Sequence, residues 1–242
     1  MGKQMRLDKY LSNMGVASRR ELKICFKKRL ISVNGEVVLS SSLKVDTETD
    51  IVKYKGIRVI YREYVYLLLN KPQGVVSAKT DKRFETVVDI VREEYGHYDM
   101  FPVGRLDRDT EGLLILTNDG DFTHDLLSPK KHVPKTYFAD IDGCVTEEHV
   151  KLFKEGIALE DGYQCMPADL EILSVDEENK SSEINITLHE GKFHQVKRMF
   201  EAVDTEVLYL KRVKMGNLDL DPELELGDYR ELTEEEMVLL GK

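Results

Sequence analysis

The sequence of 242 residues lacks the long apolar runs and the paired cysteines that mark several large classes of protein. No window approaches the ~20 apolar residues of a membrane-spanning helix, and the N-terminal MGKQMRLDKY has charges where a signal peptide needs an apolar stretch. The three cysteines, Cys25, Cys144 and Cys165, lie far apart, and there is no CxxC motif. This pattern favours reduced thiols in the cytosol and gives a structural zinc site no starting point. We therefore expect a cytoplasmic globular protein.

The sequence also lacks the common motifs for nucleotides, dinucleotides, a catalytic serine and a catalytic zinc. It contains no GxxxxGK[ST], no GxGxxG after a strand, no GxSxG and no HExxH. The six histidines are scattered. His189 and His194 are the closest pair, but a turn at 190–192 separates them, which favours surface polar residues over metal ligands. The sequence thus contains no familiar motif for a cofactor or a metal.

The charged residues are distributed unevenly along the chain. The net charge is −10, yet the segment from Met1 to Ile31 contains nine basic residues and two acids, which gives +7. From Asn217 to Lys242 there are nine acids and two bases, which gives −7. A basic segment of this kind is either a binding surface for a polyanion such as RNA or a solvated helix surface, and charge alone does not separate the two.

The first sixty residues show signals for two short helices and a hairpin. Apolar residues at helical spacing predict a helix over 6–14. Ser18 and Glu21 have the spacing of a capping box at the start of a second helix, which runs to about residue 29. In ISVNGEVV (31–38), Asn-Gly lies between alternating apolar residues, which is the strongest short-range signal for a β-hairpin.

Two helices and a hairpin with basic residues on one helical face resemble the small RNA-binding module first seen in a small-subunit ribosomal protein and in tyrosyl-tRNA synthetases. The segments MRLDKYLSNMGVASRRE and ISVNGEVV carry the resemblance, which covers about residues 5–55. It implies that the basic face binds RNA phosphates and shape, with an affinity that depends on salt. The residues expected to contact RNA in this module are Arg6, Arg19, Arg20, Lys23, Lys27 and Lys28.

After a short linker at 57–63, strands and helices alternate irregularly. Apolar runs predict strands over 64–70, 113–117, 135–141, 168–175, 184–188 and 206–213. Helices are predicted over 86–94, 122–127, 147–155, 193–203 and 234–240, the last opened by a capping box of Thr233 and Glu236. The irregular order favours an α+β fold around one mixed, mainly antiparallel sheet over a doubly wound sheet. We expect an RNA-binding module at 1–58 and a second domain at 64–242.

A dense charged loop, GRLDRDTEG (104–112), directly precedes the apolar strand LLILT. Three acids and two arginines lie within this loop, and a rigid neighbouring strand is able to hold a reactive group in place. The commoner explanation of such a cluster is a salt-bridged turn without chemistry. A catalytic use requires that a carboxylate is kept ionised by a cation and faces a pocket.

Four segments together resemble the RNA pseudouridine synthases: GRLDRDTEGLLILTNDG, the earlier LLNKPQGVVS, the following SPKKHVPKTY and the later EGKFHQVKRMF. They occur in order over nearly the whole chain. The resemblance is to the branch that modifies single uridines of ribosomal RNA and carries the same RNA-binding module in front. It implies an isomerase that needs no cofactor, no metal and no energy input, and that acts on a uridine flipped out of its stack.

The resemblance also implies roles for individual residues. Asp107 matches the catalytic aspartate, as nucleophile or base, and the sequence leaves open whether it attacks the uracil ring or the ribose. Tyr137 matches the tyrosine that lies against the target uracil. Lys197 matches the basic residue that pairs with the aspartate, a position where many relatives have arginine. Arg105 and Arg198 are expected to contact RNA.

Helix geometry offers a partial check on the choice between Lys197 and Arg198. Val196, Met199 and Phe200 belong to the buried stripe of the expected helix. At about 100° per residue, Lys197 flanks this stripe, whereas Arg198 points more nearly away from it. Lys197 is therefore expected to reach into the pocket and Arg198 to meet phosphate.

The motif segments favour the small-subunit branch. HQVKRMF, NKPQGVVS and KTY are more similar to the segments of small-subunit enzymes than to those of large-subunit enzymes, which tend to have NREVRR or NRQVRR in place of HQVKRM. We expect isomerisation of one uridine in 16S ribosomal RNA, of the uridine 516 type. The expected partner is this RNA, as a precursor or in an assembling particle, and the expected state is a monomer without membrane association. Two alternatives stay open: a large-subunit (23S) pseudouridine synthase, and a non-catalytic RNA-binding factor of ribosome assembly.

Overall fold

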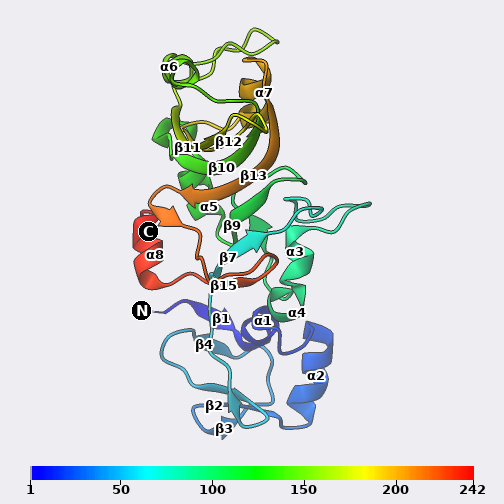
Figure 1. Cartoon of the computed structure of the whole chain (residues 1–242). Helices are drawn as coiled ribbons and strands as arrows, with labels where there is room; N and C mark the ends of the chain where they lie inside the picture. Colours follow the sequence, from blue (N-terminus) through cyan, green and yellow to red (C-terminus); the bar gives the residue numbers. More distant parts are fainter. Residues whose placement is uncertain (1) are drawn as a thin grey trace. The chain divides into compact units, whose positions relative to one another are not determined.

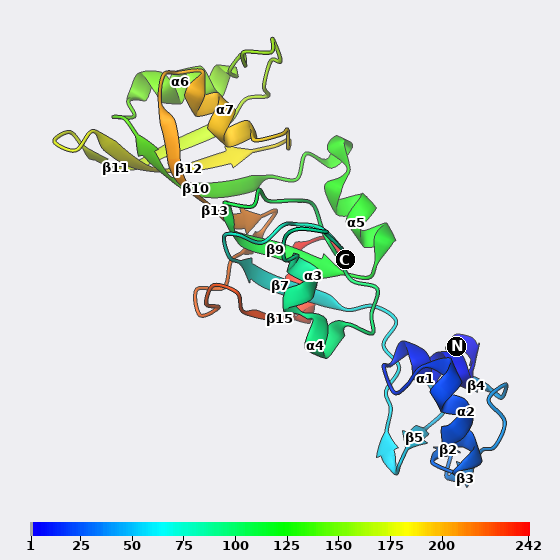
Figure 2. The ribbon, with the colours of Figure 1, turned by 90° about the vertical axis from the view of Figure 1, so that its right-hand side faces the viewer.

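The computed structural model describes residues 2–242, and these residues form two compact units. The first unit contains the residues up to Val65 together with Val91–Met100, and the second contains Tyr66–Ile90 together with Phe101–Lys242. Figures 1 and 2 show the course of the chain through each unit, coloured along the sequence. In the described part of the chain, no helix is both long and apolar enough to cross a membrane.

The first unit is built from short helices and strands. Its helices are α1 (Leu7–Asn13), α2 (Arg19–Lys27) and α4 (Arg92–Tyr95). Its strands are β1 (Gln4–Arg6), β2 (Ile31–Val33), β3 (Glu36–Val37), β4 (Lys44–Asp46), β5 (Val52–Tyr54) and β6 (Ile57–Arg58). β1 pairs with β4, and the other four strands form an antiparallel sheet in the order β3-β2-β5-β6. The apolar sides of α1, α2 and β2 share one core that includes Leu11, Phe26 and Ile31.

Local signals explain the start of α2 and the hairpin that follows it. The Ser18 hydroxyl accepts a hydrogen bond from the Glu21 amide at 3.3 Å, and the Glu21 carboxylate accepts one from the Ser18 amide at 3.0 Å. The predicted capping box is therefore confirmed. Asn34 and Gly35 both have positive φ, +52° and +88°, as a two-residue type I′ turn requires. This turn joins β2 to β3, so the predicted hairpin is confirmed.

The segment 91–100 packs with the first unit, although the sequence places it inside the second domain. Val91, with φ −93° and ψ 4°, interrupts the helix predicted over 86–94, and the chain continues as α4. The His97 ring then lies against Gly15, where a Cβ would be only 2.7 Å from the ring carbon Cγ. A single continuous helix is therefore the wrong prediction for this region, because its second half belongs to the other unit.

The second unit is built on one nine-stranded sheet. Its strands are β7 (Tyr66–Lys71), β8 (Phe101–Pro102), β9 (Glu111–Thr117), β10 (Lys135–Asp142), β11 (Asp169–Asp176), β12 (Ser181–Leu188), β13 (Glu206–Met215), β14 (Leu218–Asp219) and β15 (Tyr229–Glu231). Their order is β11-β12-β10-β13-β9-β7-β15, with β8 beside β9 and β14 beside β13. The β13–β9 pair is parallel and its neighbours in the sheet are antiparallel. The α+β fold with a mainly antiparallel sheet is therefore confirmed.

Helices cover the two halves of this sheet around separate cores. They are α3 (Val87–Ile90), α5 (Gly120–Leu127), the 3-10 helix η1 (Pro129–Lys131), α6 (Glu147–Glu155), α7 (Gln195–Glu201) and α8 (Glu234–Leu239). α6 and α7 lie over the half formed by β10–β12 (Figure 2), and they bury Phe153 and Phe200 there. α5 packs Phe122 and Leu126 against β7 and β9. β13 contributes to both cores, Leu210 to the first and Met215 to the second, and so links the two halves.

Most predicted elements of this unit are present with shifted ends. The helix predicted over 193–203 is shorter and begins only at Gln195, because His194 has a positive φ of +49°. The capping box of Thr233 and Glu236 at the start of α8 is confirmed. The short strands β8, β14 and β15 had no apolar alternation to predict them, and they are defined by hydrogen bonds to longer neighbours.

Candidate active site

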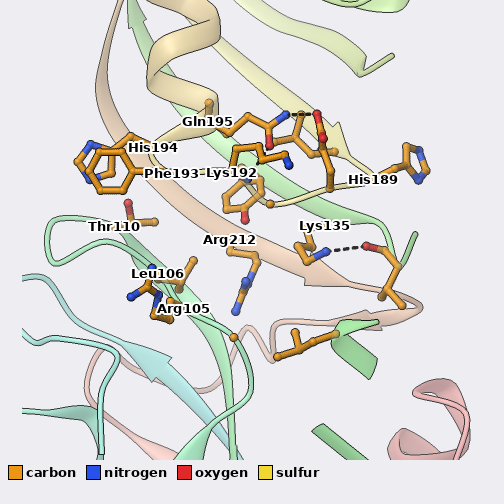
Figure 3. A pocket seen from close by; sticks show the side chains of 18 of the residues that line it. Arg105, Leu106, Thr110, Lys135, His189, Lys192, Phe193, His194, Gln195 and Arg212 are labelled. Carbon is orange, nitrogen blue, oxygen red and sulfur yellow. Dashed lines mark hydrogen bonds between the residues drawn. The ribbon is translucent and has the colours of Figure 1, made fainter. Parts of the chain in front are cut away.

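A cavity of about 610 Å³ lies in the second unit, where the charged loop meets the central sheet. Figure 3 shows its lining, which comes from segments far apart in the sequence. These are the loop 104–110, the strands β10 and β13, the segment 126–133, and the turn 188–194 with the first turn of α7. The sheet order brings them together, because β13 pairs with β10 on one side and with β9, which follows the loop, on the other.

Lys71 holds the charged loop in one conformation. It is the last residue of β7 and is fully buried. Its Nζ donates to the backbone carbonyls of Pro72, Asp107 and Thr110 at 2.9–3.0 Å. Burial lowers the pKa of the Lys71 ammonium to about 8, against the opposing attraction of the nearby carboxylates. Because one ammonium binds several carbonyls of one loop, Lys71 positions Asp107 at the cavity.

Gly112 allows β9 to approach β13 closely at the end of the same loop. It pairs with Arg212 across the parallel strands, and its φ is +100°. A Cβ at this position would lie 2.2 Å from the carbonyl oxygen of Arg212. A side chain is therefore excluded here, and the close approach fixes the loop beside β13.

Asp107 lies half-buried in the cavity wall beside His194. Its Oδ1 is 3.5 Å from Nε2 of His194. The His194 ring stacks on Phe193, with ring centroids 3.8 Å apart. His189 and His194, expected to be surface polar residues rather than metal ligands, are both partly exposed and line the cavity. The signal for His194 was its place inside the motif segment EGKFHQVKRMF.

Lys197 lines the cavity, as helix geometry predicted, but its ion pair is with a different aspartate. Its Nζ lies 2.6 Å from Oδ2 of Asp109, and this hydrogen bond holds the pKa of Asp109 below its usual value. Arg198 lies 2.5 Å from Asp161. The predicted pairing of Lys197 with Asp107 is therefore not found. Asp107 and Asp109 are two residues apart in one turn. Because α7 begins only at Gln195, Lys197 lies next to Asp109.

Tyr137 reaches the same cavity from β10. It lies opposite Arg212 on β13 and opposite Ile186 on β12, and it packs half-buried against the core under α6 and α7. Asp107, Tyr137 and Lys197 come from three separate motifs, and all three line one cavity.

The residues expected to contact RNA lie in different surroundings. Arg105 is exposed and lines the cavity. Arg6 is bound to Asp8 through two hydrogen bonds of 2.8 and 3.1 Å, and Arg198 is bound to Asp161. The other five are exposed on and directly after α2: Arg19, Arg20, Lys23, Lys27 and Lys28. The α2 cations are thus presented to solvent, whereas Arg6 and Arg198 have partners within the chain.

The side chains around the cavity define the chemistry that it supports. Among residues 2–242 no cluster of three or more potential metal ligands occurs. The lining instead supplies two carboxylates, three imidazoles, one phenol and several cations. A fixed carboxylate beside cations is suited to act as a nucleophile or a base, and a flat aromatic ring is suited to stack on a base.

Comparisons with known proteins show the family of the chain. The chain matches the model of the RNA pseudouridylate synthase family over residues 65–202 and that of the S4 domain over residues 5–52. It is 48% identical to an uncharacterized RNA pseudouridine synthase of Bacillus subtilis, over 98% of this chain and 99% of that protein. It is 42% identical to the ribosomal large subunit pseudouridine synthase B of Bacillus subtilis, over 96% and 93%. It is 36% identical to the ribosomal small subunit pseudouridine synthase A of Vibrio cholerae, over 98% and 100%.

A solved structure gives the same result. The crystal structure of a pseudouridylate synthase matches with a TM-score of 0.67 and 35% identity, over 98% of this chain and 99% of that one. The family match covers more than half of the sequence, and the S4 match lies within the first unit. The chain therefore belongs to the RNA pseudouridine synthases, enzymes that isomerise uridine in RNA to pseudouridine, and it carries an S4 domain in front of the catalytic part.

Proposed function

We propose that this pseudouridine synthase modifies one specific uridine of small-subunit (16S) ribosomal RNA, of the uridine 516 type, with Asp107 as its catalytic carboxylate. The observation that carries the proposal is the cavity in which Asp107, His194 and Tyr137 lie together. Its volume of about 610 Å³ is in the range of sites that enclose a small molecule. A uridine flipped out of the RNA stack is the part of the substrate that enters such a site.

Each of these residues has one part in the reaction. Asp107 acts as the nucleophile or base that starts cleavage of the bond between uracil N1 and ribose C1′. Tyr137 lies against the flipped ring and holds it while it turns. Lys197, bound to the neighbouring Asp109, and His194, beside Asp107, supply the polar surroundings that an ionised carboxylate needs. The ring rejoins C1′ through C5, so the product is an isomer and no cofactor is consumed.

The S4 domain supplies the affinity for RNA. The exposed cations of α2 bind phosphates with little dependence on sequence, and Arg105 meets the RNA at the cavity. Selection of one uridine then depends on the structure of the RNA around it, as a precursor or in an assembling ribosomal particle. The enzyme acts as a monomer in the cytoplasm, where ribosomal RNA is made and assembled.

A uridine of large-subunit (23S) RNA is the second candidate substrate. It is favoured by the 42% identity to the Bacillus subtilis large-subunit enzyme, against 36% to the Vibrio cholerae small-subunit enzyme. The small-subunit target is favoured by the segments HQVKRMF, NKPQGVVS and KTY, because large-subunit relatives tend to have NREVRR or NRQVRR in place of HQVKRM. Both candidates share the same reaction and the same cavity.

The test is pseudouridine mapping on total ribosomal RNA from cells that lack this gene, by carbodiimide modification and primer-extension stops. We expect one stop in 16S RNA to disappear and to return when the wild-type gene is supplied. The Asp107→Asn variant should not restore it, because an amide cannot act as the nucleophile. Asp142→Asn, which changes an exposed carboxylate of β10 outside the cavity lining, is the control and should restore it.

Other outcomes of the mapping contradict parts of the proposal. A stop lost from 23S RNA instead would establish the second candidate. A stop restored by Asp107→Asn would remove Asp107 from the reaction.

A further inference from the structure

Two cations of the cavity lining have only backbone carbonyls as hydrogen-bond partners among residues 2–242. Arg212 comes from β13 and Lys135 from β10, and both line the cavity (Figure 3). Nε of Arg212 donates to the carbonyl of Leu113 at 2.8 Å, and Nζ of Lys135 donates to the carbonyl of Val133 at 2.9 Å. These two side chains therefore bring positive charge into the interior of the site, where it is available to a ligand.

Arg212 is almost completely buried and is not fully satisfied. Its side chain is 2% exposed, and its Nη2 has no hydrogen-bond partner within residues 2–242. The hydroxyl of Thr110, which lines the same cavity, also has no partner. Buried polar atoms without partners cost free energy and are uncommon in native proteins. Two of them at one cavity indicate that a ligand completes their hydrogen bonds.

The register of the sheet places Arg212 next to Tyr137. The two residues lie directly opposite each other on β13 and β10, and opposite residues project from the same face of a sheet. Lys135 precedes Tyr137 by two positions on β10 and so shares that face. Burial and the nearby Arg212 both lower the pKa of Lys135, which agrees with this proximity. A flat base that lies on Tyr137 has its polar edge next to these two cations.

We propose that Arg212, with Lys135 beside it, binds a carbonyl oxygen of the target uracil and stabilises the negative charge that the ring acquires during isomerisation. This inference rests on the proposed function, because it takes the flipped uridine as the occupant of the cavity and Tyr137 as its platform. It adds a binding site for the base to the residues that act on the glycosidic bond.

The negative charge follows from the bonds that change. When the N1–C1′ bond breaks, its electron pair stays with the uracil ring, and the charge spreads to the O2 and O4 oxygens. The ring then forms the C5–C1′ bond, loses the proton on C5 and gains one on N1, so nothing is oxidised or reduced. A guanidinium fixed at a carbonyl oxygen binds the charged ring more strongly than the neutral uridine, and this difference lowers the barrier.

A phosphate is the other source of acceptor oxygens in the same nucleotide. Burial favours the base over the phosphate, because Arg212 is 2% exposed and the phosphates remain on the RNA chain that runs outside the cavity. Arg105, which is exposed, is the arginine in the lining that is suited to a phosphate.

The test measures single-turnover rates on a ribosomal RNA fragment that contains the uridine identified by mapping. The fragment is made with uridine, 2-thiouridine or 4-thiouridine at the target, because sulfur is a weaker hydrogen-bond acceptor than oxygen. The enzymes are the wild type, Arg212→Met, Lys135→Met and the control Lys214→Met, which removes a cation of β13 that lies outside the cavity lining.

We expect wild type to react about tenfold more slowly with one of the two thio-substituted RNAs. Arg212→Met should slow the reaction of uridine RNA by about 10²-fold, the loss typical of one preorganised donor, and should no longer distinguish that thio-substituted RNA from uridine RNA. Lys135→Met should show a smaller loss of rate with uridine RNA and a smaller loss of the thio effect. Lys214→Met should behave as wild type, and the Kd for RNA should stay within about twofold in all variants.

The inference is overturned if the thio effect is as large in Arg212→Met and Lys135→Met as in wild type, or if wild type shows no thio effect at either position. It is also overturned if the variants abolish the effect of a phosphorothioate at the target nucleotide, since Arg212 would then bind a phosphate. Thermal unfolding of each variant separates loss of fold from loss of the site, and Lys135→Met tests the site by itself if Arg212→Met does not fold. If the wild-type enzyme forms no pseudouridine, the proposed function is wrong, and the inference with it.

Discussion

The cations of the two units differ in their surroundings. In the first unit, the cations of α2 are exposed to solvent. In the second unit, Lys71 and Arg212 are buried and bound to backbone carbonyls. An exposed charge acts over roughly the Debye length of ~8–10 Å and is weakened by salt, whereas a buried charge acts through single hydrogen bonds and loses its hydration. The first arrangement is suited to bind any RNA backbone, and the second to hold a loop in place, as Lys71 does, or to bind single atoms of a ligand.

The largest effect in this comparison is expected from a cavity cation. Lys197→Met should lower the single-turnover rate by about 10²-fold or more with little change in RNA affinity, because it removes a cation from the lining of the active site. Arg198→Met is the matched control, since Arg198 is the next residue of α7 and is held by Asp161. Equal losses of rate in the two variants would contradict a specific role of Lys197 at the cavity.

The surface cations should behave in the opposite way. Replacement of Arg19, Arg20, Lys23 and Lys27 by alanine should weaken RNA binding by about 10–10²-fold and reduce the dependence of log Kd on log salt by up to about three. The rate at saturating enzyme should stay near that of wild type. A matched control removes four exposed lysines of the second unit: Lys82, Lys130, Lys151 and Lys180. An unchanged salt dependence in the α2 variant would contradict the role of this surface.

The pH dependence of turnover tests the buried ammonium of Lys71. Its pKa is lowered from the usual 10.5 to about 8, so turnover should fall several-fold between pH 8 and 9.5 as Lys71 loses a proton and its hold on the loop weakens. The effect of Lys71 on stability depends on pH in the opposite direction to its effect on turnover. The cost of burying the charged form is present below pH 8 and disappears as pH rises toward 10.5, so this group adds to the free energy of unfolding over that range.

Lys71→Arg provides the control for this profile, because a guanidinium does not deprotonate in the range. If Lys71→Arg folds, its turnover should stay level to pH 9.5. A wild-type profile without a fall above pH 8 would show that the charge on Lys71 does not position Asp107.

The smallest expected effect concerns the helix that presents the surface cations. Ser18→Ala should lower the free energy of unfolding of the first unit by about 1 kcal/mol, because the Glu21 amide loses its acceptor. Ser18→Thr keeps the hydroxyl and is the control. Urea denaturation followed by circular dichroism measures both variants, and equal stability of Ser18→Ala and wild type would show that α2 does not depend on this cap.

Much of the first unit could be predicted from the sequence because its signals are local. The capping box of Ser18 and Glu21 and the Asn34–Gly35 turn each depend on residues within three positions of one another, and both are present as predicted. The segment 91–100 could not be assigned in this way, because its place is decided by contacts such as that of His97 with Gly15.

For the site, the family, the fold class and the motifs around the cavity could be inferred from the sequence alone. Which side chains contact one another depends on the tertiary fold. Lys197 binds Asp109, and His194 lies beside Asp107. Two features set these positions: α7 begins only at Gln195, and the Lys71 ammonium binds backbone carbonyls of the charged loop. Arg212 lies opposite Tyr137 because the pairing of β10 with β13 shifts register between Thr136 and Tyr137. Such pairings depend on sheet order and register between distant segments, and no interaction between near neighbours in the chain encodes them.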